Sequence, residues 1–151
     1  MADQTTYQVL NKMSEIALSG VNECFIGDAW EIEAVARKYP LMVLDNNLKN
    51  HTWQAGVINM RLDIYIMDLV NADESNELEV LSDMTNVGIQ YVNHLTDHLP
   101  DYNFYIRKNN QQTITFQTFT EKFDDKVSGV RFEVTVSIPD DGNQCESIFN
   151  I

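Results

Sequence analysis

The sequence predicts an α+β domain in which one antiparallel sheet carries two main helices on a single face. Three observations predict this fold class. Apolar residues recur at helical spacing near the start of the chain and again in its middle. Two other segments alternate apolar and polar residues, as half-buried strands do. The order is helix, strands, long helix, strands, so the helices and strands do not alternate as they would in a doubly wound fold.

The first half of the chain predicts one helix followed by short strands. A helix over about 6–19 is indicated by Tyr7, Leu10, Met13, Ile16 and Ala17, with Ser19 and Gly20 as its stop signal. The rest of this half is assigned as a short strand at 21–26, a short helix or irregular segment at 30–37, and an apolar strand at 41–44 after Pro40.

A polar, Asn-rich stretch at 45–56 is expected to be a loop, and a long half-buried strand is expected from Val57. Its buried face is predicted to hold Ile58, Met60, Leu62, Ile64 and Ile66. A polar turn at 71–75 can cap the long helix, which Pro100 stops. The predicted apolar stripe of this helix is Leu78, Leu81, Met84, Val87, Tyr91, Val92, Leu95 and Leu99, and we expect Leu81, Met84 and Tyr91 to pack on Leu62, Ile64 and Val134.

The remaining strands are expected at 102–106, around Ile114 and Phe116, and at 130–138. Proline, two aspartates and a glycine at 139–142 end the last strand. We therefore divide the chain into a single domain at 1–139 and a C-terminal tail at 140–151. The 151 residues and 44% apolar content suffice for one sizeable core.

The charge is strongly negative, because 10 Lys and Arg against 23 Asp and Glu give 10 − 23 = −13. The basic residues are scattered singly or in pairs, so this chain is not expected to grip nucleic acid. Such a charge suits a surface that passes DNA without holding it, or one that meets a basic partner. Neither a leader peptide nor a membrane span is recognised, and Cys24 and Cys145 are expected to be reduced thiols in a cytoplasm.

Catalytic and metal-binding patterns are weak. His94 and His98 stand at i and i+4, but the glutamate and third ligand of a zinc site are missing at the usual spacing. The acidic pairs at 124–125 and 140–141 lack the alternation of a calcium loop, and Cys24 with the distant His51 lacks a nucleophile signature. We therefore expect no catalytic, cofactor-binding or metal residue, no cofactor, and no enzyme.

Large apolar residues in polar surroundings are the candidate contact residues. They plug the end of the core or form an interaction surface, and sequence alone leaves both readings open. Phe149 and Ile151 lie in the tail, beyond the point where the domain needs more apolar surface. The residues predicted to contact other subunits are Trp30, Tyr39, Trp53, Phe149 and Ile151.

Three short stretches, at 38–44, 63–68 and 73–80, resemble small structural proteins of crAss-like gut phages. These in turn are similar to the tail-terminator and head-to-tail connector proteins of tailed phages. The resemblance covers most of residues 5–138 and includes no catalytic motif, so it assigns no functional residue.

This resemblance implies a tail-terminator-like fold and a ring of identical subunits in the neck of a virion. Such a ring would be assembled in the host cytoplasm, bind portal, neck and tail proteins, and let DNA pass through its channel without specific binding or contact with a membrane. The main alternative is an acidic inhibitor or DNA mimic that occupies a nucleic-acid enzyme, which would need carboxylates in regular rows. A small enzyme is a third option, marked by binding of a metal or small ligand.

Overall fold

The computed structural model describes residues 6–27, 38–45, 51–54, 56–71, 73, 75–98, 105–106, 114–122 and 126–139. These residues form an α+β fold, which confirms the predicted fold class. The elements in chain order are α1 (Thr6–Ala17), β1 (Glu23–Ile26), β2 (Leu41–Asp45), β3 (His51–Gln54), β4 (Val57–Leu69), α2 (Glu77–His98), β5 (Tyr105–Ile106), β6 (Gln117–Lys122) and β7 (Lys126–Pro139).

The sheet is built around β4 and β7, which pair antiparallel along the whole of β4, from Val57 opposite Pro139 to Leu69 opposite Val127. On the other side of β4, β2 pairs with one half and β3 with the other half. On the other side of β7, β6 and β5 do the same. The centre of the sheet is therefore one long two-stranded ribbon, flanked by shorter strands.

The expectation of a purely antiparallel sheet is wrong at one edge, because β1 pairs with β2 in parallel. Parallel neighbours need a connection longer than a hairpin turn. The segment between Ile26 and Leu41 supplies that length. The short helix or irregular segment predicted within it lies outside the described residues, as does the predicted tail at 140–151.

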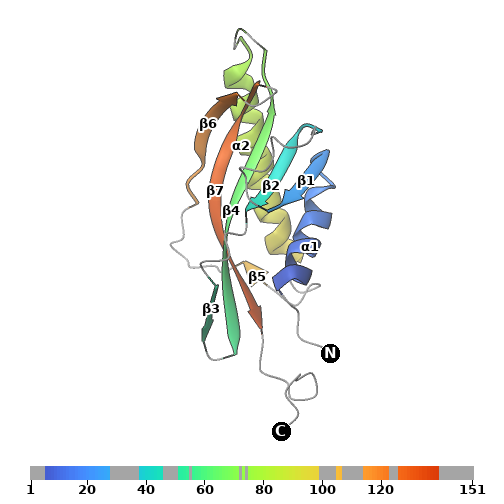
Figure 1. The fold of residues 1–151 in the computed structure, drawn as a ribbon, viewed down its shortest axis with the longest axis vertical. Coiled ribbons are helices and arrows are strands. Elements are labelled where there is room, and N and C mark those ends of the chain that lie inside the picture. Colours follow the sequence, from blue (N-terminus) through green and yellow to red (C-terminus); the bar gives the residue numbers. More distant parts are fainter. Residues whose placement is uncertain are drawn as a thin grey trace.

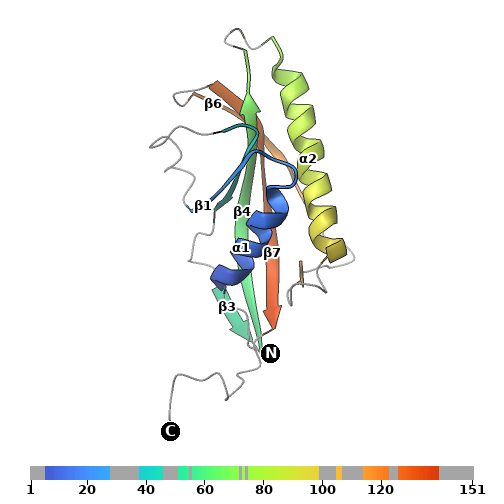
Figure 2. The ribbon, with the colours of Figure 1, turned by 90° about the vertical axis from the view of Figure 1, so that its right-hand side faces the viewer.

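Both helices cover the same face of the sheet, as predicted (Figures 1 and 2). The alternation of β4 and β7 explains this arrangement, since one set of alternate residues is almost fully buried on the helix-bearing face of the sheet. That set consists of Met60, Leu62, Ile64 and Ile66 from β4, with Val130, Phe132, Val134, Val136 and Ile138 from β7.

The buried stripe of α2 differs in phase from the predicted one. Met84 and Tyr91 are buried as expected, but Leu81 is only half-buried and Leu78 is 83% exposed. A helix turns about 100° per residue, so successive steps of three residues rotate steadily away from one face. Leu78 consequently lies about 120° from Met84 around the helix. The true stripe is Val80, Met84, Gly88, Tyr91 and Leu95.

The close packing of α2 on the sheet depends on Gly88. A Cβ atom at this position would lie 2.7 Å from the ring of Phe116 and 3.2 Å from the ring of Phe132. The two rings pack against each other with centroids 4.8 Å apart. Lack of a side chain at Gly88 thus lets the helix approach the aromatic layer.

Two segments predicted from composition take a different form. The expected loop at 45–56 contains β3, which pairs with Val57–Met60. Gly56 makes the tight turn between the two strands possible, since its φ of 81° lies in the left-handed region. The strand expected around Ile114 and Phe116 begins only at Gln117, and these two residues instead pack against the core without strand structure.

A second apolar cluster lies on the face of the sheet opposite the helices. Leu41, Val43, Met67 and Val127 are buried there, and Phe25, Tyr39, Tyr65 and Phe119 pack against them. Tyr65 and Phe119 meet edge to face, with ring centroids 6.0 Å apart. This end of the sheet therefore has apolar contacts on both faces, which explains why the first four residues of β2 are all buried.

Candidate subunit interface

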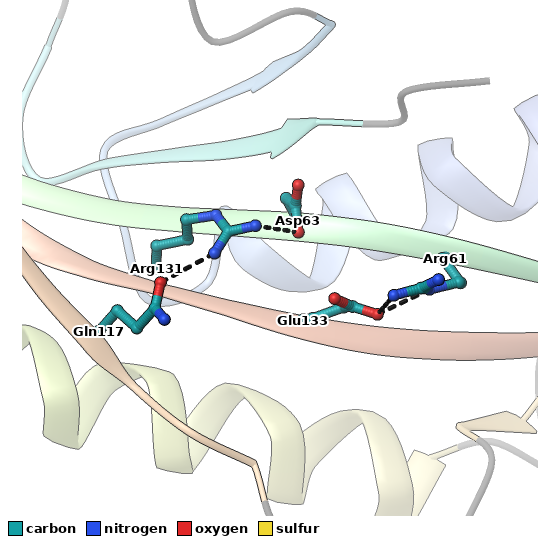
Figure 3. Close-up of polar contacts among 5 residues, drawn as sticks. All are labelled: Arg61, Asp63, Gln117, Arg131 and Glu133. Atoms are coloured by element: carbon teal, nitrogen blue, oxygen red, sulfur yellow. Dashed lines mark hydrogen bonds and ion pairs between the residues drawn. The ribbon is translucent and has the colours of Figure 1, made fainter. Parts of the chain in front are cut away.

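The middle of the helix-free sheet face is polar and carries two ion pairs (Figure 3). Arg131 donates to Asp63 at 3.0 Å and to Gln117 at 2.9 Å, and Arg61 pairs with Glu133. Both ion pairs join β4 to β7 diagonally, the arrangement in which long side chains reach across a sheet. Two arginines offset the carboxylates of Asp63 and Glu133, and Asp45, opposite Asp63 on β2, adds one further negative charge to this face.

One end of the sheet extends beyond both helices (Figures 1 and 2). It consists of β3, the first residues of β4 and the last residues of β7. The described sequence there, at 51–54, 57–60 and 136–139, contains no Asp, Glu, Lys or Arg, and Met60, Val136, Ser137 and Ile138 are buried. In a chain of net charge −13, the described exposed residues of this projecting end, Thr52, Trp53 and Pro139, carry no charge.

Trp53 is the most prominent side chain of the projecting end. It is 66% exposed and lies directly opposite Ile58, hence on the same sheet face as the helices. β3 pairs with β4 on one side, and no described strand pairs with its other side. A strand edge that no described strand pairs, beside an exposed tryptophan, is a typical protein-binding surface.

A hollow of about 200 Å³ lies between the C-terminal end of α1 and the middle of α2. Its floor is apolar and formed by Ile16, Ala17, Val21, Met42 and Val87. Its rim is formed by the exposed residues Ser19, Gly20, Gln90 and His94.

The two helices are joined beneath this hollow by a buried hydrogen bond. The Tyr91 hydroxyl donates to the carbonyl oxygen of Met13 at 3.0 Å. Burial raises the pKa of this hydroxyl well above its ordinary value, so it stays a neutral donor. The bond holds α1 against α2 and keeps the shape of the hollow.

The predicted contact residues do not come together in one described surface. Trp53 lies on the projecting end, whereas Tyr39 is half-buried against the second apolar cluster at the other end of β4. Trp30, Phe149 and Ile151 lie outside the described residues. Their role in subunit contact stays a prediction.

The histidine pair is only partly described. His94 is exposed on α2, at the rim of the hollow, and the side chain of His98 lies outside the described residues. Among the described side chains, no group of three or more His, Cys, Asp or Glu is placed to hold a metal ion. The acidic pairs at 124–125 and 140–141 also lie outside the described part of the chain.

Cys24 has the surroundings of a packed thiol. It is partly buried against the main core and forms no disulfide. Burial raises the pKa of the thiol to about 11, which is opposite to the shift that activates a cysteine nucleophile.

This pKa leads to a test of reactivity. In a Cys145→Ser variant, we expect alkylation of Cys24 by iodoacetamide at pH 8 to be at least about tenfold slower in the folded protein than in denaturant, because little thiolate is present. Mass spectrometry of timed samples measures both rates. Equal rates would show that the thiol is not shielded.

No protein-family model matches the chain, and no curated protein matches it significantly. Within the described residues, neither helix is both long and apolar enough to cross a membrane.

Sequence reasoning found Trp53 but missed both the projecting end that carries it and the separate hollow between α1 and α2. The projecting end could have been recognised from the absence of charge at 51–60 in an otherwise acidic chain. The hollow had no such signal, because its residues come from α1, the turn after α1, β2 and α2 and meet only in three dimensions. Together, these features suit protein–protein contact.

Proposed function

We propose that the protein is a virion structural protein, a ring-forming subunit of a phage head-to-tail connector of the tail-terminator type. It joins the portal to the tail and lines the DNA channel. The observation that carries this proposal is the projecting end of the sheet, whose described residues include no Asp, Glu, Lys or Arg, with exposed Trp53 and an edge of β3 that no described strand pairs. The resemblance of three stretches to small crAss-like phage structural proteins supplies the biological setting.

The distribution of charge supports assembly through this end. Copies that each carry −13 repel one another, and the repulsion is least where the touching surfaces hold no charge. An uncharged, partly apolar edge also gains from leaving water. The remaining acidic surface would repel the phosphates of DNA, so that DNA slides through a channel without being held.

The structure gives less support to a DNA mimic. Such a protein needs carboxylates in rows that imitate the phosphates, of which each strand carries one per about 3.4 Å of helix axis. The exposed face of α2 begins with Glu79 and Asp83 and ends with Asp97, but amides occupy its middle. The amide-bearing residues are Asn86, Gln90 and Asn93. A row interrupted for this length is a poor copy of a phosphate backbone.

Mass measurement tests the proposal. The purified chain is examined by native mass spectrometry alone and after mixing with portal and neck proteins of a crAss-like phage, and its DNA binding is measured by gel shift. We expect a closed homo-oligomer, either free or on the portal assembly, and no gel shift at physiological salt. A chain that remains monomeric in every mixture would contradict the proposal.

A further inference from the structure

We propose that Trp53 of one copy inserts into the hollow between α1 and α2 of the next copy. The inference rests on the proposed ring and names the contact that would build it. Each copy carries a protruding side chain, Trp53, and a concave surface, the hollow between α1 and α2. No described residue of β3 lines the hollow, so each copy offers both features at separate places.

The exposed lining of the hollow is slightly more polar than apolar, which suits only part of an indole side chain, namely one edge of the ring together with its N–H donor. The floor of the hollow is apolar, and Ile16, Ala17, Val21 and Met42 are each at least nine-tenths buried. The indole N–H needs an acceptor when it leaves water, and the rim offers the side-chain oxygens of Ser19 and Gln90. An apolar floor with a polar rim is the usual anatomy of a pocket that receives an anchoring aromatic residue.

The size of the hollow is also suitable. The hollow measures about 200 Å³ and is about half open to solvent, so it can receive one edge of the indole ring without enclosing the whole side chain. Trp53 has 66% of its surface exposed, so most of the side chain is available for burial. Aromatic side chains of this kind bury about 150–250 Å² at interfaces.

The hollow and the described part of the projecting end both lack the charged residues that are common elsewhere in the chain. The residues that line the hollow include no Asp, Glu, Lys or Arg, and neither does the described part of the projecting end. The chain as a whole carries 33 such residues, the sum of 10 and 23. Two copies of an acidic protein can therefore join these surfaces without burying a charge, which would be costly.

Trp53 and the hollow lie at different places on the chain, and this determines the symmetry with which identical copies can associate. Figures 1 and 2 show β3 at the end of the molecule toward which the N-terminal end of α1 points, whereas the hollow lies at the C-terminal end of α1. The 12 residues of α1 rise about 18 Å. A contact between different patches of identical chains is heterologous, and it makes a ring when the rotation between copies closes.

The contact can be located by placing the photo-reactive residue p-benzoylphenylalanine at position 53. This substitution keeps an aromatic ring, and illumination links it to a neighbouring C–H group. We expect covalent dimers whose cross-linked peptide contains residues 16–21 or 87–94. The same residue at Leu78, which is 83% exposed and distant from the hollow in sequence and helix face, is the matched control and should give no such adduct.

The energy of the contact is tested by two further variants. Trp53→Ala removes the inserted side chain, and Gln90→Trp fills the hollow from its exposed rim. Each should weaken assembly at least about 30-fold, the loss typical of a central interface residue. Leu78→Ala removes a comparably exposed side chain and should change assembly less than about twofold. Thermal melts of all three variants check that each of them is folded.

The possible results distinguish a failure of the proposed Trp53 contact from a failure of the proposed function. A wild-type chain that never oligomerises, alone or on portal and neck proteins, would overturn both. A wild-type chain that forms rings while Trp53→Ala and Gln90→Trp assemble normally would overturn the inference and leave the proposed function standing. Adducts from position 53 that map outside the hollow would likewise overturn the inference alone.

Discussion

Replacing Gly129 with alanine is expected to destabilise the protein by at least about 3 kcal/mol, the upper part of the usual range for overpacking. A Cβ atom at Gly129 would lie 2.0 Å from the carbonyl oxygen of Ile66 and 2.8 Å from the Cα atom of Met67. These are backbone atoms of the central strand β4, so no side-chain rotation can relieve the clash. The ribbon formed by β4 and β7 must separate locally.

Thermal denaturation measures this effect. For a chain of this size, a loss of 3 kcal/mol corresponds to a fall in melting temperature of roughly 6–12 °C. Gly20→Ala is the matched control, because the nearest atom to a Cβ atom there is 3.9 Å away and the backbone is not left-handed. We expect the control to melt within about 2 °C of the wild type. A Gly129→Ala variant as stable as the control would show that the two strands are not this close.

Phe132→Ala is expected to cost about 3–5 kcal/mol, as truncations of buried aromatic residues do. Phe132 is only 1% exposed, lies opposite Ile64 in the central ribbon, and packs against Phe116 beneath Gly88 of α2. The substitution leaves a cavity where the sheet meets α2. Because α2 also forms one wall of the hollow, we expect assembly to weaken together with stability.

Urea denaturation measures the loss, from the change in midpoint at unchanged slope. Phe132→Leu is the control, since it keeps most of the apolar volume and should cost less than about 1.5 kcal/mol. If Phe132→Ala lost no more unfolding free energy than Phe132→Leu, the packing of α2 against the rings of Phe116 and Phe132 would be wrong.

The fold was largely predictable from the sequence, because the alternation in β4 and β7 and the helical spacing in α1 and α2 are strong and extend over many residues. Boundaries and phase were less accurate. Leu78 was assigned to the buried stripe because leucine is apolar, yet the first turn of α2 points it into solvent. Only the position of the sheet decides which side of a helix is covered.

The candidate interface was predictable only in part. Trp53 stood out because a tryptophan in a polar stretch is unusual, but β3 itself is four residues long and carries too little pattern to be recognised as a strand. The need for Gly129 and the presence of the hollow arise from contacts between segments distant in sequence. Such contacts leave no local periodicity.

Negative-stain electron microscopy of the purified chain, alone and bound to portal and neck proteins, tests the central claim most directly. The proposed function predicts closed rings with an open central channel in the wild type, and the proposed Trp53 contact predicts that these rings are lost in Trp53→Ala while Leu78→Ala retains them. Particles that are only monomers or compact dimers without a channel, under both conditions, would contradict the assignment of this chain as a ring-forming connector subunit.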